Sequence, residues 1–217
     1  MMDFDMLDET SQNFDDLSFL SQIQLLQIQN KHLENLCYTD DLTKLRNKRY
    51  FCFCLEQCWK ELACHQAPLS LIFLDIDNLK IYNLTQGEQA GDKCVCQIAD
   101  VVSRCVDKTG ALSVRYQDDT FAAILPNITT NNALELSETI REEVKNLGIK
   151  HAISRLGGLK VPVVTVSLGV ACTIPKLEQS SSVLVDAALR ALNRAKKLEG
   201  DSSCVSTSFQ YGFINPD

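Results

Sequence analysis

The chain has 217 residues, 45% of them hydrophobic and 23% charged, which is typical of a globular protein and unlike a disordered or fibrous one. The formal net charge is −7 and the basic residues form only short clusters, so the sequence offers no basic surface for nucleic acid. No apolar run is long enough to span a bilayer and the acidic start, residues 1–5, lacks the basic region of a signal peptide, so we expect a cytoplasmic protein.

Two N-terminal segments precede the main domain. Residues 1–18 carry six acidic residues and no basic one, which predicts a flexible lead-in. Over residues 19–37, apolar residues recur at three- and four-residue steps around the polar Asn30, a pattern typical of helices that pair in register. We expect this helix to form a homodimer; the alternative is a helix that packs on its own domain.

From residue 38 to residue 200, strands and helices alternate. The apolar run at 69–74 and the β-branched run at 161–170 predict two buried strands, and residues 112–116 and 121–125 predict a hairpin. Helical spacing of apolar residues predicts further helices at 51–62, 95–105, 132–147 and 184–198. We therefore expect an α+β fold in which helices pack on one sheet, whereas residues 201–217 form a tail without an assigned structure.

The ten cysteines do not indicate a disulfide framework or a zinc site. No two of them have C-x-x-C spacing, and the chain has only three histidines. Cys54 and Cys58 fall on the same helical stripe as Leu55 and Leu62. We expect the cysteines to act as small hydrophobic residues in a reducing compartment.

The strongest local signal for chemistry is the pair Asp75 and Asp77, directly after the strand at 69–74. Side chains alternate along a strand, so both carboxylates should project from one face at the carboxyl end of the sheet, where ligands of open sheets gather. Mg²⁺ prefers such oxygen ligands, and the hairpin turn supplies two more carboxylates, Asp118 and Asp119. Spacing alone leaves the question open, because acidic strand ends followed by turns also occur without a metal.

Six segments share their order and spacing with one known family. They are 39–51 (TDDLTKLRNKRYF), 75–80 (DIDNLK), 83–92 (NLTQGEQAGD), 115–121 (RYQDDTF), 164–171 (VTVSLGVA) and 191–196 (ALNRAK). Together they resemble the motifs of GGDEF domains, the diguanylate cyclase family. The resemblance implies a central mixed sheet flanked by helices, as in nucleotide cyclases, with active members condensing two GTP molecules into cyclic di-GMP.

The resemblance also implies roles for single residues. Mg²⁺ would be held by Asp75, the backbone carbonyl of Ile76 and Asp119. Asn83 and Asp92 would hydrogen-bond the guanine edge, although both residue types also favour turns and caps.

The phosphates of the nucleotide would meet a second group of residues. Lys80 and Lys196 would contact them with their side chains, and Asn78 and Leu79 with backbone N–H groups. The spacing alone also allows this role: Lys80 is five residues beyond Asp75 and could reach a phosphate there as a point charge.

The departures from the family pattern concentrate in the hairpin. Gln117 and Asp118 replace two glycines, which in the family permit positive φ and close approach of the backbone to a ligand. Thr120 replaces the glutamate that assists deprotonation of the attacking hydroxyl, and losing such a base typically costs about 10²–10⁴-fold in rate. The product-inhibition motif R-x-x-D is absent, with 108–111 (KTGA) in its place, and Asp201 follows Gly200 where the family has arginine.

We therefore expect a degenerate GGDEF domain that has lost cyclase activity. It would bind guanine nucleotide with Mg²⁺ and act as a regulatory or protein-binding module in cyclic-di-GMP-type signalling. Two alternatives remain: an active diguanylate cyclase that tolerates the altered loop, and a nucleotide-independent scaffold that binds a partner through the helix at 19–37.

Overall fold

The computed structural model describes residues 22–27, 29–30, 33, 37–151, 163–198 and 200–206. The expected lead-in at 1–18 lies outside these residues, as does the tail beyond residue 206. The chain divides into two units, Met1–Thr39 and Asp40–Asp217. In the first unit, the described residues from 22 to 38 are helical.

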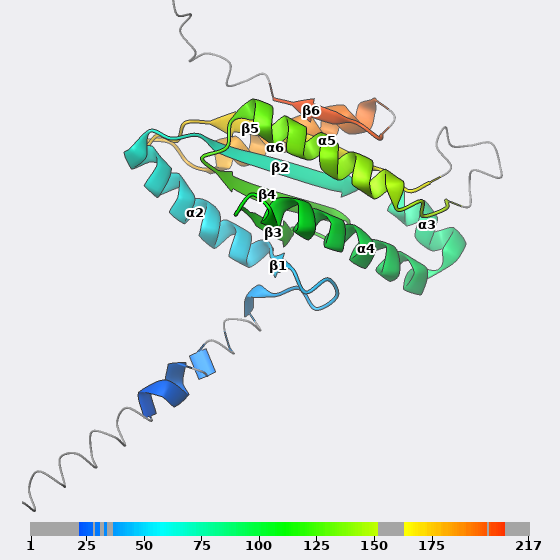
Figure 1. Cartoon of the computed structure of the whole chain (residues 1–217), viewed down its shortest axis with the longest axis horizontal. Coiled ribbons are helices and arrows are strands. Elements are labelled where there is room, and N and C mark those ends of the chain that lie inside the picture. Colours follow the sequence, from blue (N-terminus) through cyan, green and yellow to red (C-terminus); the bar gives the residue numbers. More distant parts are fainter. Residues whose placement is uncertain are drawn as a thin grey trace, which may run out of the picture. The chain divides into compact units, whose positions relative to one another are not determined.

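The second unit contains a six-stranded sheet with helices on both faces (Figure 1). Its elements are β1 (Arg46–Asn47), α2 (Lys48–His65), β2 (Leu69–Ile76), α3 (Leu79–Gln86), α4 (Glu88–Asp107), β3 (Leu112–Arg115), β4 (Thr120–Pro126), α5 (Thr130–Asn146), β5 (Val166–Thr173), α6 (Ser182–Lys197) and β6 (Ser203–Val205). The strand order is β1-β3-β4-β2-β5-β6. The edge strand β1 is parallel to β3 and the edge strand β6 is parallel to β5, whereas the other pairs are antiparallel. The sheet is therefore mixed, and the α+β expectation is confirmed.

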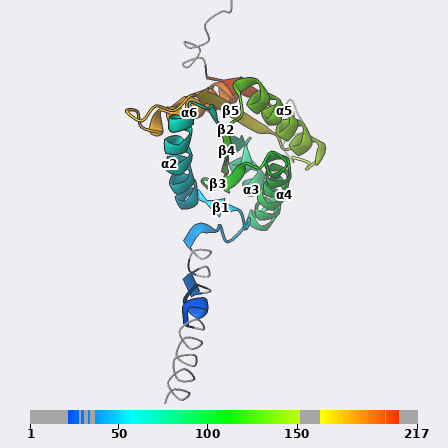
Figure 2. The same ribbon diagram turned by 60° about the vertical axis from the view of Figure 1, so that its left-hand side comes forward.

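Strand β2 lies at the centre of the fold and is buried along its whole length. Because side chains alternate along a strand, Leu71 and Phe73 pack in the core beneath α2 and α6, whereas Ile72 and Leu74 pack in the core beneath α3, α4 and α5. Figure 2 shows the sheet between these two helical layers. Because both faces of β2 are buried, the strand has no alternation of apolar and polar residues, which explains the unbroken apolar run in the sequence.

Several helix and strand boundaries differ from the sequence prediction. The helix predicted from Asn132 begins at Thr130, after the extended residue Thr129. The strand predicted at 161–170 begins at Val166 and continues to Thr173, because pairing with β2 sets its ends rather than the apolar run. The last helix ends at Lys197, which leaves Leu198 exposed.

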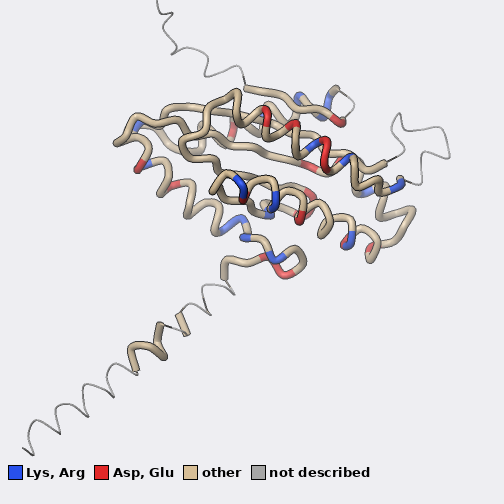
Figure 3. The backbone as a smooth tube through the Cα atoms, in the orientation of Figure 1, with Lys and Arg blue, Asp and Glu red and all other residues tan. Residues whose placement is uncertain are grey.

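None of the ten cysteines, all of which lie in the described ranges, forms a disulfide. Cys94 and Cys105 are buried in the core beneath α4, and burial raises the pKa of Cys94 to about 11. These two therefore act as small hydrophobic residues, as expected, whereas Cys52 and Cys64 are exposed on α2. None of the described helices is both long and apolar enough to cross a membrane. Acidic and basic residues are interspersed along α4 and α5 (Figure 3).

Candidate functional site

The expected pairing of the hairpin with the central strand brings two carboxylates together. Strand β4 lies antiparallel to β2, and Asp75 is paired in register with Thr120. The backbone N–H of Ile76 donates to the carbonyl of Asp119 across 3.1 Å, which fixes the turn of the hairpin beside the end of β2. The residues from the two motifs that the resemblance assigns to Mg²⁺ therefore lie next to one another.

Asp75 is a buried carboxylate with two partners. Its Oδ1 lies 2.8 Å from Nζ of Lys196, in the last turn of α6, and its Oδ2 accepts a hydrogen bond of 3.1 Å from Oγ1 of Thr120. Burial raises the pKa of Asp75, and the charge of Asp119 adds to this, while the contacts with Lys196 and Thr120 oppose it. A cation bound between Asp75 and Asp119 would reduce the repulsion of their carboxylates.

Thr120 links the two carboxylates. Its Oγ1 is within 3.1 Å of Oδ2 of Asp75 and 3.3 Å of Oδ1 of Asp119. A hydroxyl carries one proton, so it donates to one carboxylate at a time and has no basic lone pair comparable to a carboxylate. The position at which the family has a glutamate therefore holds a group that bridges acids and cannot take up a proton at neutral pH.

Asp77 lies on the same face of the sheet as Asp75 but has other partners. The carboxylate of Asp77 accepts hydrogen bonds from Oγ1 of Thr165, Oγ of Ser167 and the backbone N–H of Asp201, at 2.8, 2.7 and 2.9 Å. Ser167 is paired in register with Asp75, so both aspartates lie beside this residue. Asp77 ties β2 to β5 and to the C-terminal segment.

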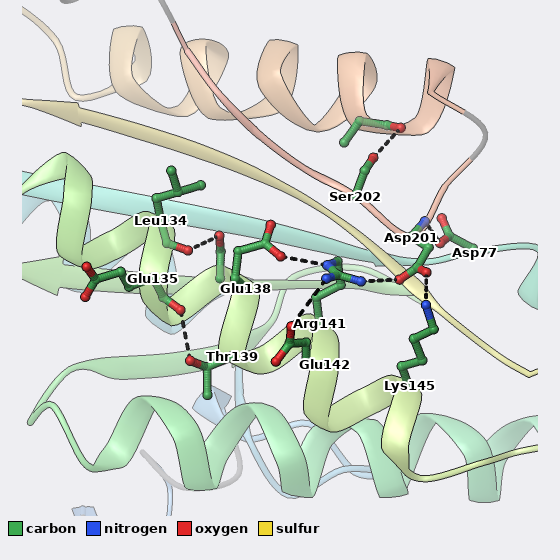
Figure 4. A network of polar contacts seen from close by, with 12 residues as sticks. Asp77, Leu134, Glu135, Glu138, Thr139, Arg141, Glu142, Lys145, Asp201 and Ser202 are labelled. Carbon is green, nitrogen blue, oxygen red and sulfur yellow. Dashed lines mark hydrogen bonds and ion pairs between the residues drawn. The ribbon is translucent and has the colours of Figure 1, made fainter.

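Asp201 connects this contact to α5 (Figure 4). Its Oδ1 lies 2.7 Å from Nη1 of Arg141 and its Oδ2 lies 2.6 Å from Nζ of Lys145. Arg141 also pairs with Glu138 at 2.9 Å. The acidic replacement of the family's arginine is therefore matched by basic residues on α5, and it anchors the segment leading to β6.

A pocket of about 370 Å³ opens between α3 and the hairpin turn. It is lined by Leu79, Lys80, Asn83, Leu84, Glu88, Asp118 and Asp119. Asn78 precedes α3 with a φ of 57°, and the first N–H groups of a helix have no acceptor within it. Of the residues that the resemblance assigns to a nucleotide, the structure gathers Lys80, Leu79 and Asn83 around this pocket together with Asp119.

Asn83 is oriented by a glycine on the next helix. A Cβ at Gly91 would lie 1.9 Å from Oδ1 of Asn83, so only glycine leaves room for this side chain. The Oδ1 atom is buried against Gly91 and has no hydrogen-bond partner, so it remains an unsatisfied acceptor until the side chain turns toward the pocket. Asp92 is exposed at the next position of α4 and is not among the residues that line the pocket.

The hairpin turn is held from outside by Arg115. Its Nη2 donates to the carbonyl of Asp118 at 2.7 Å, and its Nη1 lies 3.0 Å from Oδ1 of Asp40. Burial alone would raise the pKa of Asp40, but hydrogen bonds from Thr43 and Arg115 lower it below its usual value. Gln117 and Asp118 are exposed and neither has a positive φ, so the turn accommodates them without backbone strain.

The residues fit a Mg²⁺ ion in part. Asp75 and Asp119 are neighbouring carboxylates, and burial, followed by the charge of Asp119, raises the pKa of Asp75. No group of three His, Cys, Asp or Glu side chains gathers as a metal site among the described residues, so backbone or ligand oxygens would have to complete the shell. Lys196 already contacts Asp75, but its side chain is 42% exposed and can turn away.

A central mixed sheet with an acidic site at the end of β2 defines a nucleotide-cyclase-like α+β domain. A sequence profile described as "Diguanylate cyclase, GGDEF domain" matches residues 37–202. The chain belongs to the GGDEF domain family.

Curated relatives agree with this assignment. Diguanylate cyclase A of Treponema denticola is 28% identical over 197 residues, which cover 87% of this chain and 51% of the relative. Diguanylate cyclase DgcM of Escherichia coli K12 is 33% identical over 141 residues, which cover 65% of this chain and 32% of the relative. The chain thus spans about half, or less, of the length of these relatives.

Solved structures share the fold. The coiled coil and GGDEF domain of DgcB from Caulobacter crescentus, in complex with c-di-GMP, aligns with a TM-score of 0.75 at 25% identity, covering 90% of this chain and 99% of that one. Diguanylate cyclase SiaD from Pseudomonas aeruginosa, in complex with its activator SiaC, aligns with a TM-score of 0.71 at 24% identity, covering 93% and 76%. The second likeness shows the fold alone.

Sequence reasoning missed several residues of the site region. Glu88 and Leu84 line the pocket, and Arg141 and Lys145 hold Asp201. Asp201 could have indicated these basic residues, because an acidic side chain at a position where the family has arginine is expected to pair with basic ones. Nothing in the local sequence indicates that those partners lie on α5.

Proposed function

We propose that this chain is a GGDEF domain that binds a guanine nucleotide without converting it to cyclic di-GMP, and that it acts as a regulatory or protein-binding module. The observation that carries the proposal is Thr120. Its hydroxyl bridges Asp75 and Asp119 at the position where the family has a glutamate, so no carboxylate is placed there to accept a proton. The retained pocket with Lys80 and Asn83 supports the binding half of the proposal.

In this proposal each group around the pocket binds or orients the nucleotide. Lys80 and the N-terminus of α3 face a phosphate, and Asn83 accepts from the guanine edge through Oδ1 once its side chain turns from Gly91 toward the pocket. Mg²⁺, when bound by Asp75, Asp119 and the carbonyl of Ile76, would neutralise charge between the protein and a phosphate. Lys196 would then leave Asp75 and contact that phosphate.

Product analysis tests the loss of cyclase activity. Concentrated protein is incubated with GTP and Mg²⁺, and separately with Mn²⁺, and cyclic di-GMP is measured by mass spectrometry. We expect no product from protein shown to be folded by circular dichroism. Binding is tested in parallel with GTP and with GMP, each at millimolar concentration with Mg²⁺, and undetectable binding of both would refute the nucleotide half of the proposal.

An active cyclase is the second candidate, favoured by the adjacent carboxylates Asp75 and Asp119 beside Lys80. It predicts cyclic di-GMP that disappears in the variant Asp75→Ala. Product that persists in this variant would point to a contaminating enzyme. Product that disappears would show that Thr120 is a tolerated replacement and would overturn the first proposal.

The helix at 19–37 is proposed to form a homodimer. Its described apolar side chains Ile23, Leu26 and Leu33 lie at the spacing of paired helices. Deletion of residues 1–36 should change the mass in solution from dimer to monomer, measured by light scattering. An unchanged mass would exclude this segment as the dimer contact.

A further inference from the structure

The pocket beside α3 carries more negative than positive charge. Its lining includes three carboxylates, Glu88, Asp118 and Asp119, and one cation, Lys80. Two further cations lie close by and are engaged: Lys196 pairs with Asp75, and Arg115 pairs with Asp40 and donates to the carbonyl of Asp118. A ligand that fills this pocket therefore meets one positive side chain and three negative ones.

Asp118 and Glu88 are the lining carboxylates for which the described part of the chain supplies no partner, and Asp118 is the one on the hairpin turn. Asp119 is within hydrogen-bond distance of Thr120, whereas the Asp118 side chain has no hydrogen bond or ion pair within the described part of the chain. The carbonyl of Asp118 accepts a hydrogen bond of 2.7 Å from Nη2 of Arg115, which holds the backbone of Asp118 in place. The unpaired charge of Asp118 thus stands at the wall of the pocket, at a position where the family has a glycine with no side chain.

The remaining lining suits a flat ring with N–H donors. Leu79 and Leu84 supply apolar surface, and Leu84 is 79% exposed although it lies beside the pocket. Glu88 offers acceptor atoms, and Asn83 adds an acceptor when its side chain turns away from Gly91. Acceptors dominate the polar lining, so the ligand it favours brings donors and little negative charge.

We propose that Asp118 makes this pocket selective for guanine ligands that carry at most one phosphate, against GTP. The proposal rests on the proposed function, because it concerns which guanine ligand the same pocket takes. Lys80 balances a single phosphate, whereas a triphosphate chain brings additional negative charge close to Asp118 and Asp119. An unpaired charge that repels a competing ligand is an established way to obtain specificity.

The test is a calorimetric titration of the full chain with guanosine, GMP, GDP and GTP, each with and without Mg²⁺. We expect affinity to be highest for guanosine or GMP and to fall for GTP by about tenfold or more, since like charges near a protein surface repel strongly. The variant Asp118→Asn keeps the size of the side chain and removes its charge. It should raise GTP affinity by about tenfold and change guanosine affinity by less than about twofold.

Two controls separate this effect from a general change in charge. Asp186→Asn removes an exposed carboxylate on α6, ten residues and therefore about 15 Å along the helix from Lys196, and it should leave the order of affinities unchanged. Raising the salt concentration should reduce the discrimination against GTP in wild type and have little effect in Asp118→Asn.

The outcomes distinguish the two proposals. GTP binding as tightly as GMP or more tightly in wild type, or an unchanged GTP affinity in Asp118→Asn, would overturn the role of Asp118 while the guanine-binding function stands. Absence of binding by all four ligands would overturn both. Weak GTP binding that Asp118→Asn strengthens, with guanosine unaffected, would establish Asp118 as the residue that determines specificity.

Discussion

Lys196 lies 2.8 Å from Asp75, and this ion pair joins the last turn of α6 to the end of the central strand β2. The resemblance assigns the lysine to phosphates and the aspartate to Mg²⁺. In this structure the two groups neutralise each other instead. Ligand binding by the family's arrangement therefore has to separate them, and the partly exposed lysine is the group free to move.

Removal of the Asp75 charge should change how stability depends on pH. Because the pKa of Asp75 is raised by folding, the folded chain binds this proton more tightly than the unfolded chain does. The contribution of Asp75 to stability is therefore present below its ordinary pKa of 3.8 and is lost as pH rises through the raised value. Relative to wild type, Asp75→Asn should gain stability over that range.

Urea titrations in EDTA between about pH 4 and about pH 7 measure this difference. We expect Asp75→Asn to be neutral to about 1 kcal/mol more stable than wild type near pH 7. A variant that is clearly less stable at neutral pH would mean that the pair with Lys196 outweighs the cost of burial.

Thr120 should contribute through its hydroxyl rather than its shape. Thr120→Val keeps the shape of the side chain and leaves Oδ2 of Asp75 without this donor, so we expect a loss of about 1–2 kcal/mol in the free energy of unfolding. Thr120→Ser keeps the hydroxyl and serves as the matched control. Equal losses in the two variants would assign the effect to packing and not to the hydrogen bond.

Gly200 is required by both its backbone and its surroundings. Its φ is +83°, and a Cβ there would lie 2.8 Å from Oδ2 of Asp77. Gly110 has a φ of +70° with nothing within 4 Å of a Cβ, so alanine there would cost only the backbone strain of a positive φ. We expect Gly110→Ala to lose about 1 kcal/mol and Gly200→Ala about 2–3 kcal/mol in thermal or urea unfolding. Similar losses would show that the Asp77 carboxylate moves aside freely.

The pair of Asp201 and Arg141 should be worth more than an exposed ion pair. Both side chains are 16% exposed, whereas Arg104 and Glu143 are 57% and 35% exposed. A double-mutant cycle with alanine should give a coupling energy of about 1–2 kcal/mol for the first pair and below about 0.5 kcal/mol for the second. Equal coupling energies, or a first value that vanishes in high salt, would argue against an anchoring role for Asp201.

Local pattern was enough to predict the central elements, and the resemblance at 75–80 and 115–121 was needed to place Asp119 with Asp75. The apolar run of β2 and the two strands of the hairpin have clear periodicity, and a short turn forces antiparallel neighbours. The motif at 115–121 therefore had to lie beside one end of the sheet. Helix α3 was missed because only two of its eight residues are buried, which leaves no apolar stripe to recognise.

The sequence by itself determined the family, the central strand and which residue types stand at the motif positions. Only the tertiary structure decided their partners: Lys196 on Asp75, and Asp201 on Asp77 across 124 positions of the chain. Such contacts depend on how α6 and the segment before β6 pack against the end of β2. Periodicity records the conformation of each element and the face it buries, but not which distant side chain reaches a given carboxylate.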